Sequence, residues 1–145
     1  MKLIDLNLLI YAVNTDSEVH KPAKAWLEST LSGDEPVALP WVVLLGFLRV
    51  MTSRRVMTRP LTAEQAIRIV DRWVQLEQVV LLHPGGDHWR IMKGLLERAG
   101  TAGNLTTDAH LAALAIEQDC ELCSTDRDFG AFPDLRWINP LGSPS

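Results

Sequence analysis

The segment Lys2-Leu3-Ile4-Asp5-Leu6-Asn7-Leu8-Leu9-Ile10 decides the fold, because it sets a carboxylate between two apolar runs. Lys2 to Asp5 predicts a short buried strand, and Leu8 to Val13 predicts the start of a helix or turn. An unpaired carboxylate at the edge of a core costs free energy, so it is normally paired, hydrogen-bonded or bound to a metal ion. The segment therefore predicts a buried strand that ends at a polar site.

The rest of the chain continues this alternation of short apolar strands and amphipathic helices. Further strands are predicted at Val37 to Leu39, Val79 to Leu82, Glu121 to Thr125 and Arg136 to Ile138. Further helices are predicted at Pro22 to Ser32, Trp41 to Thr52, His88 to Ala99 and Asp108 to Gln118, and another is predicted after Thr62. Thr62 and Gln65 form a capping box for the helix that follows them. Asp87 and Gly100 mark the two ends of the helix at His88 to Ala99, and Thr106 or Thr107 is expected to cap the helix at Asp108 to Gln118. Such alternation predicts an α/β fold with a mostly parallel sheet covered by helices on both faces.

Length and composition predict one ordinary globular domain. The 145 residues are 47% apolar and 22% charged, which is usual for such a domain. The domain is expected to cover residues 1–141, and the Pro/Gly/Ser-rich residues 142–145 are expected to form a disordered tail. The longest apolar stretch, Trp41 to Leu48, is too short to span a bilayer, so no membrane partner is expected.

The net charge of −4 argues against a protein that holds nucleic acid by bulk positive charge. It does not exclude a nuclease, because bound metal ions would offset clustered carboxylates. Residues 49–72 carry six arginines against two acidic residues, whereas residues 119–134 carry five acidic residues against Arg127. This asymmetry suits a metal site with a phosphate-binding rim, although any single arginine fits a solvated helix face equally well.

The cysteines, Cys120 and Cys123, have C-x-x-C spacing without a second pair that could complete a zinc site. Positions three apart on a strand point to opposite faces, so buried reduced thiols are expected. Few cysteines and no signal peptide indicate the cytoplasm.

Aspartates flank the predicted apolar segments at Asp5, Asp108, Asp126 and Asp128. Asp5 and Asp126 follow predicted strands, and ligands of parallel sheets bind at the carboxyl ends of the strands. Asp108 begins a predicted helix, where the helix dipole favours negative charge. The topology therefore predicts that Asp5, Asp108 and Asp126 share one edge of the sheet.

Carboxylates without histidine partners suit Mg²⁺ or Mn²⁺ better than Zn²⁺. A cation of this kind neutralises a phosphoryl group and lowers the pKa of the attacking water. Each aspartate also has a structural alternative. Asp5 fits a hydrogen-bonded strand end, Asp108 fits a helix cap, and Asp126 and Asp128 fit an aspartate-rich turn.

Four segments together resemble the PIN-domain ribonucleases, specifically the VapC toxins of bacterial VapBC toxin–antitoxin systems, and the resemblance extends over nearly the whole chain. The segments are Leu3-Ile4-Asp5-Leu6-Asn7-Leu8-Leu9-Ile10-Tyr11-Ala12, Leu45-Gly46-Phe47-Leu48-Arg49-Val50, Asp108-Ala109-His110-Leu111-Ala112-Ala113-Leu114-Ala115 and Ser124-Thr125-Asp126-Arg127-Asp128-Phe129.

The resemblance implies a three-layer α/β/α PIN domain with five parallel strands in the order 3-2-1-4-5, commonly dimeric. It implies Mg²⁺-dependent endonucleolytic cleavage of RNA, with Mn²⁺ as a substitute, restrained by a VapB-type antitoxin. It further implies metal ligands at Asp5, Asp108 and Asp126, with Asp128 close by, and hydrogen-bonding support from Asn7 and Thr125.

One position departs from the family pattern. Many members carry a glutamate, which helps to hold a second metal, at the place of Gly46; Glu64 and Glu97 lie on other predicted helices. We therefore expect one firmly held Mg²⁺ and a second, if used, recruited with the RNA phosphate. The alternative is a weakened PIN module that binds antitoxin or RNA without efficient cleavage.

Other candidate groups give weaker signals. The histidines are dispersed, and an aspartyl phosphatase would usually have a second aspartate at the place of Asn7. Arg54, Arg55 and Arg59 fit RNA contact as well as they fit an antitoxin or solvent role. Core or dimer contacts are expected, rather than base stacking, for Trp26, Trp41, Trp73 and Trp89.

Overall fold

The computed structural model describes residues 1–142, so the predicted tail lies outside the described residues except for Gly142. Its strands are β1 (Lys2–Ile4), β2 (Val37–Ala38), β3 (Val79–Val80), β4 (Glu121–Cys123) and β5 (Trp137–Ile138). Its α-helices are α1 (Leu6–Val13), α2 (His20–Ser32), α3 (Trp41–Met51), α4 (Ala63–Val74), α5 (His88–Ala99) and α6 (Thr106–Glu117), and two short 3₁₀ helices are η1 (Gly103–Leu105) and η2 (Arg127–Ala131).

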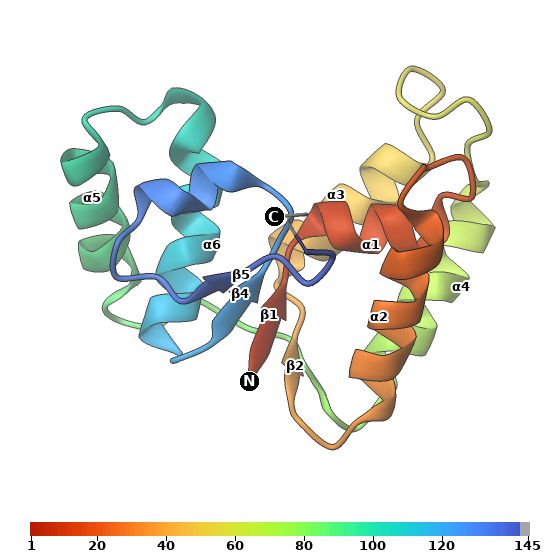
Figure 1. Cartoon of the computed structure of the whole chain (residues 1–145), viewed down its shortest axis with the longest axis horizontal. Helices are drawn as coiled ribbons and strands as arrows, with labels where there is room; N and C mark the ends of the chain where they lie inside the picture. The colour runs from red at the N-terminus through yellow and green to blue at the C-terminus, as the bar shows by residue number, and fades with distance from the viewer. Residues whose placement is uncertain (143–145) are drawn as a thin grey trace.

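The strands form one parallel sheet in the order β3-β2-β1-β4-β5, which confirms the predicted order. Figure 1 shows α5 and α6 on the left of the sheet and α1 to α4 on the right. On one side α5 packs against α6, and on the other α1 packs against α2 and α3. The predicted α/β/α architecture is therefore confirmed.

The central strands are short and fully buried. Leu3 and Ile4 of β1 and Leu122 and Cys123 of β4 have no exposed surface. Strand β4 was expected to reach Thr125 but ends at Cys123, beside the end of β1 at Ile4. The backbone amide of Asp5 donates to the carbonyl of Cys123 (3.0 Å), so the segments that follow β1 and β4 leave the sheet side by side.

Helix α6 is apolar nearly all round because it lies between the sheet and α5. Its buried residues are Ala109, Leu111, Ala112, Ala113, Leu114 and Ala115. The alanines lack bulky side chains, which permits close packing on both sides. The expected cap at Thr106 or Thr107 is wrong, because η1 runs directly into α6 and Leu105 holds the cap position without a side-chain bond.

The other helix ends confirm part of the capping pattern. Thr62 Oγ1 accepts from the Gln65 amide (3.1 Å), and Gln65 Oε1 accepts from the Thr62 amide (2.9 Å), forming the predicted box. Gly100 ends α5 in the left-handed conformation (φ 74°) that glycine tolerates.

Asp87 does not cap α5 with its side chain. Instead the Glu117 carboxylate, at the far end of α6, accepts hydrogen bonds from the amides of Gly85 (2.8 Å) and Asp87 (3.0 Å). A Cβ atom on Gly85 would lie 2.5 Å from a Glu117 carboxylate oxygen, so a larger residue there would require the Glu117 carboxylate to move. The end of α6 is thereby tied to the loop before α5.

The cysteine prediction is confirmed, and the tryptophans lie in different environments. Cys120 and Cys123 are buried free thiols, as expected. Trp73 packs in the core against Phe47, with ring centroids 4.8 Å apart, whereas Trp41 and Trp89 are exposed. No helix within the described residues has the length and apolar character needed to cross a membrane.

Candidate active site

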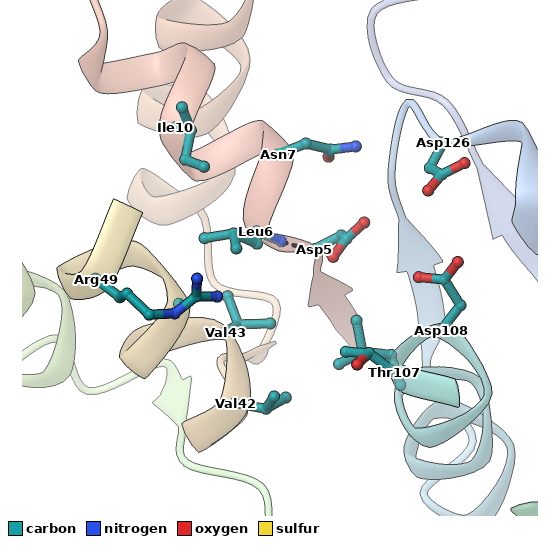
Figure 2. A pocket seen from close by; sticks show the side chains of 12 residues that line it. Asp5, Leu6, Asn7, Ile10, Val42, Val43, Arg49, Thr107, Asp108 and Asp126 are labelled. Carbon is teal, nitrogen blue, oxygen red and sulfur yellow. Dashed lines mark hydrogen bonds between the residues drawn. The ribbon is translucent and has the colours of Figure 1, made fainter. Parts of the chain in front are cut away.

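The carboxyl ends of β1 and β4 deliver the site residues to one edge of the sheet. Asp5 directly follows β1, and Asp126 follows β4 by a short turn; β1 and β4 are neighbours. Asp108 stands in the first turn of α6. Figure 2 shows the carboxylates of Asp5, Asp108 and Asp126 around one opening. The predicted convergence of these three aspartates is present.

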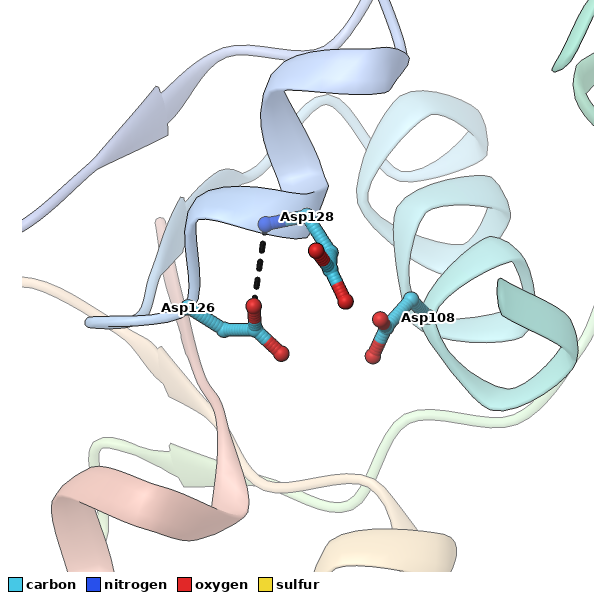
Figure 3. Close-up of side chains that lie close together, drawn as sticks. All are labelled: Asp108, Asp126 and Asp128. Carbon is cyan, nitrogen blue, oxygen red and sulfur yellow. Dashed lines mark hydrogen bonds between the residues drawn. The ribbon is translucent and has the colours of Figure 1, made fainter. Parts of the chain in front are cut away.

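The closest grouping of carboxylates brings Asp108 and Asp126 together with Asp128 (Figure 3). Each offers an oxygen that lies within 4.8 Å of the others. Asp126 Oδ1 accepts from the backbone amide of Asp128 (2.9 Å), which fixes the turn that begins η2. Asp128 is exposed, but it belongs to this cluster as closely as the two partly buried aspartates.

Asp5 is held differently from the other aspartates. Its Oδ1 accepts from the Leu6 amide (2.7 Å) and caps α1, and its Oδ2 accepts from the Ser124 hydroxyl (2.7 Å). Only 8% of the residue is exposed. The structural alternative for Asp5 is therefore realised, yet the carboxylate still lines the pocket.

Ser124 joins three parts of the site through one hydroxyl. The group donates to Asp5 and accepts from the Asp126 amide (3.0 Å) and from Asn7 Nδ2 (3.3 Å). A hydroxyl has one donor and two acceptor positions, so its bonding capacity is full. The residue is completely buried, and Trp137 Nε1 donates to its carbonyl (2.9 Å).

The supporting hydroxyl expected at Thr125 is thus contributed by its neighbour. Within residues 1–142, the Thr125 side chain makes no hydrogen bond, whereas Ser124 makes three. A small polar residue directly after the apolar pair Leu122-Cys123 was the signal that could have identified Ser124. Asn7 lines the pocket, and its Oδ1 is buried without a partner among the described residues.

Burial, with crowding of like charges as a further cause, sets the electrostatics of the site. Partial burial, followed by Asp126, Asp5 and Asp128, raises the pKa of Asp108 to about 6. Burial also raises the pKa of Asp5, while its bonds from Ser124 and Leu6 oppose that rise. Clustered carboxylates of this kind are stabilised when a cation lies between them.

The pocket has a volume of about 350 Å³ and two unlike walls. The acidic wall consists of Asp5, Asp108 and Asp126. The opposite wall, which we call the α3 wall, comes from α1 and α3 and consists of Leu6, Ile10, Val42, Val43, Gly46 and Arg49.

Gly46 lies in the α3 wall, where the resemblance would place a glutamate. A Cβ atom on Gly46 would lie 2.7 Å from Leu6 Cδ2, so Leu6 fills the space in which a longer side chain would begin. Glu64 and Glu97 are exposed on α4 and α5 and do not line the pocket.

The basic residues divide into two groups. Arg54 and Arg55 are exposed in the loop after α3, and Arg59 is paired with Asp16. Arg49, which was not singled out from the sequence, lines the pocket. Its position three residues after Gly46 on α3 was the signal, because residues three apart share a helix face.

The histidines are less dispersed than expected. His88 Nε2 and His110 Nδ1 lie 2.9 Å apart where α5 packs on α6. Burial, followed by the neighbouring His88, lowers the pKa of His110. The pair belongs to the interface between the helices and does not line the pocket.

Comparison with known proteins identifies the family. The family model named PIN domain matches residues 2–135, nearly the whole chain. The chain belongs to the PIN domain family. This PIN domain is 46% identical over 140 residues to Ribonuclease VapC37 of Mycobacterium tuberculosis, with 97% of each chain covered. It is 45% identical over 141 residues to Ribonuclease VapC33 of the same species, covering 97% of this chain and 99% of the relative.

Solved structures agree on the fold. FitAcB from Neisseria gonorrhoeae has a TM-score of 0.68 at 21% identity, covering 97% of this PIN domain and 98% of that chain. The structure of VapBC2 from Rickettsia felis bound to a promoter DNA fragment has a TM-score of 0.67 at 20% identity. The match covers 95% of this PIN domain and 97% of that chain. The predicted resemblance to the VapC group is confirmed by the relatives, and the predicted fold by these structures.

Proposed function

We propose that this PIN domain is a metal-dependent endoribonuclease that cleaves RNA phosphodiesters and serves as the toxin of a type II toxin–antitoxin pair. One observation carries the proposal: carboxylate oxygens of Asp108, Asp126 and Asp128 gather within 4.8 Å of one another in a pocket that Asp5 also lines. Relatives with 45% and 46% identity along nearly their full length are named ribonucleases.

The side chains present fit a hard divalent cation. All the clustered donors are carboxylate oxygens, which Mg²⁺ and Mn²⁺ prefer. The unpartnered Asn7 Oδ1, buried next to the site, is a further oxygen able to accept from a water molecule there. We propose Asp5, Asp108 and Asp126 as the ligands of Mg²⁺, with Mn²⁺ able to substitute, and Asp128 as a residue that orients water or completes the ligand set.

A divalent cation at this position supplies neutralisation of the phosphoryl charge and a lower pKa for the attacking water. The chain's own residues hold the geometry. Ser124 fixes the Asp5 carboxylate and the backbone before Asp126, and the Asp128 amide fixes Asp126. These bonds orient the acidic wall before substrate arrives, which lowers the cost of reorganisation during the reaction.

Partners and location follow from the same proposal. The RNA is the substrate, a VapB-type antitoxin restrains the enzyme, and the toxin forms a homodimer. Structures with a similar fold include VapBC-1 from nontypeable Haemophilus influenzae and a toxin–antitoxin complex from Klebsiella pneumoniae. The buried free thiols of Cys120 and Cys123 are compatible with the cytoplasm, the compartment we assign.

A second candidate is a PIN module that binds antitoxin or RNA with little cleavage. Gly46 favours it, because α3 brings no carboxylate to the pocket. The two candidates differ in one measurable property. An endoribonuclease cleaves RNA with added Mg²⁺ and stops when EDTA is added, whereas the module binds RNA or antitoxin under both conditions.

The experiment compares the purified chain with the variants Asp126→Asn and Asp71→Asn on total cellular RNA. Asp71 is an exposed aspartate on α4, outside the pocket, so its change is the matched control. We expect Mg²⁺-dependent cleavage by the wild type and by Asp71→Asn, and none by Asp126→Asn. Equal cleavage by all three would indicate a contaminating nuclease, and cleavage by none would refute the proposed activity. Mapping the cut sites then identifies the RNA target.

A further inference from the structure

The α3 wall contains a cation that the proposed mechanism has not used. Arg49 stands near the end of α3 (Trp41–Met51) and lines the pocket together with Asp5, Asp108 and Asp126. Figure 2 shows its side chain running from α3 toward the opening, across from Asp108 and Asp126. Arg49 is the one lysine or arginine that lines this pocket in the described part of the chain.

Arg49 also has no acidic partner among residues 1–142. Some other arginines do: Arg59 pairs with Asp16, Arg68 with Glu64, and Arg98 with Asp134. The Arg49 side chain is exposed to solvent and forms no ion pair of this kind. Its guanidinium donors therefore remain available for a ligand that enters the pocket.

Arg49 is the only charged residue of the α3 wall in the described part of the chain. Gly46 has no side chain and lies one helical turn before Arg49, and the nearby wall residues are the apolar Leu6 and Val43. Its own wall therefore offers no carboxylate that would compete with a bound anion for the guanidinium.

The acidic wall creates a need for such a charge. The pocket and its edge hold four aspartates, and a single divalent cation offsets only two of the four negative charges. A phosphodiester that approaches adds another negative charge and is repelled by the excess. A guanidinium opposite the acidic wall attracts the phosphate and can hold two of its oxygens with parallel N–H donors.

We propose that Arg49 is a catalytic residue that binds the RNA phosphate undergoing cleavage and stabilises the negative charge that develops on it. This inference rests on the proposed function, since it assigns a role within the same reaction. It extends that function to a residue on the opposite side of the pocket from the carboxylates.

The first test measures single-turnover RNA cleavage by the purified full chain carrying Arg49→Ala, Arg49→Lys or Arg68→Ala. Arg68 is an exposed arginine on α4 and is the control for loss of one positive charge. At saturating RNA, Arg49→Ala should lower the rate on the order of 10²–10³-fold, the usual cost of losing one donor to a developing anion. Arg49→Lys keeps the charge without the planar donors, so its cleavage rate should lie between those of the wild type and Arg49→Ala. The rate of Arg68→Ala should match that of the wild type.

The second test measures RNA binding in the absence of cleavage. We compare two proteins, the Asp126→Asn variant and the double variant that also carries Arg49→Ala. The binding of each to a fluorescent single-stranded RNA is measured in EDTA over a range of salt concentrations. Loss of one phosphate contact in the double variant should weaken RNA binding. The slope of log K against log salt concentration should then become shallower by about 0.7. A purely structural role for Arg49 would lower the melting temperature and leave this slope unchanged.

The outcomes separate this inference from the proposed function. Wild-type rates and an unchanged salt slope for the Arg49 variants, with Asp126→Asn inactive, would overturn the role of Arg49 and leave the endoribonuclease assignment intact. A shallower salt slope of RNA binding in the double variant, together with a reduced cleavage rate for Arg49→Ala, supports the role of Arg49. A wild type that never cleaves RNA overturns both.

Discussion

The two walls of the pocket are built by different means. The acidic wall is fixed by the sheet: neighbouring strands β1 and β4 end together, and Ser124 joins Asp5 to the backbone of Asp126. The α3 wall comes from α1 and α3 and carries apolar side chains, a glycine and one exposed arginine. The difference teaches that main-chain topology and the Ser124 hydroxyl position Asp5 and Asp126, whereas Arg49 stands at an exposed helix position.

The largest effect is expected where the acidic wall loses a ligand. Asp5→Asn keeps the size of the side chain but removes its charge, so cleavage in Mg²⁺ should fall on the order of 10³-fold or more. The single amide oxygen can accept from Ser124 or from the Leu6 amide but not from both, so one bond is lost; the circular dichroism spectrum should still match that of the wild type. Single-turnover cleavage of a mapped RNA target measures the rate. Retained cleavage in a preparation free of other nucleases would remove Asp5 from the site.

The next effect concerns how the acidic wall is fixed. Ser124→Ala leaves Asp5 Oδ2 and the Asp126 amide without their partner, at a cost of about 1–3 kcal/mol in the free energy of unfolding. The bond from Ser124 lowers the pKa of Asp5, so the variant should also bind Mn²⁺ more weakly. Urea denaturation and calorimetric titration measure these changes. Thr125→Val is the matched control, and equal losses from both variants would show that Ser124 has no special position.

A smaller effect probes whether the α3 wall can accept a carboxylate. Gly46→Glu must displace Leu6, because a Cβ atom at position 46 would lie 2.7 Å from Leu6 Cδ2. We expect Gly46→Glu to destabilise the fold and Leu6→Ala to relieve part of that loss. A coupling free energy of about 1 kcal/mol between the changes is expected in a double-mutant cycle of urea unfolding. Additive effects would mean that Leu6 does not define the space at Gly46.

The smallest effect concerns the charge of the acidic wall without metal. The pKa of Asp108 is about 6 when folded and 3.8 as the reference value, so the folded state binds the proton more tightly. The contribution of protonated Asp108 to the free energy of unfolding is fully present below pH 3.8 and is lost as the pH rises through 6. Asp108→Asn avoids the loss and should be more stable than the wild type above pH 6 by about 1 kcal/mol, a reduced value because solvent screens the partly exposed carboxylate.

Thermal unfolding in EDTA checks this expectation, with a shift of roughly 3 °C at pH 7.5 and none near pH 4. Added Mg²⁺ should reverse the order, because only the wild type retains the full ligand set. A variant less stable than the wild type at pH 7.5 in EDTA would contradict the crowding of charge at Asp108.

The sequence predicted the acidic wall because its residues obey a simple rule. Asp5 and Asp126 follow apolar strands, and the carboxyl ends of neighbouring parallel strands share an edge. Strand order came from the family resemblance, since alternation alone does not state which strands are neighbours. The individual helices were predictable from apolar spacing and caps such as Thr62 with Gln65.

Other features depend on contacts between distant segments. The role of Ser124 requires that Asp5 and Asn7, more than a hundred residues away in sequence, come within hydrogen-bonding distance. The pairing of His88 with His110 arises only when α5 packs on α6. Arg49 was one of six arginines in a basic stretch, and only the helix phase relative to the pocket distinguishes it.

The bond between Glu117 and the loop at Gly85 gives α6 a second function besides filling the core. Asp108 and Glu117 are nine residues apart on one helix, a span of about 13 Å at 1.5 Å per residue. A helix anchored at one end transmits a shift along its axis to the other end with little bending. Gly85 lies outside the pocket, and a substitution there that displaces the Glu117 carboxylate would release this anchor of the helix that carries Asp108.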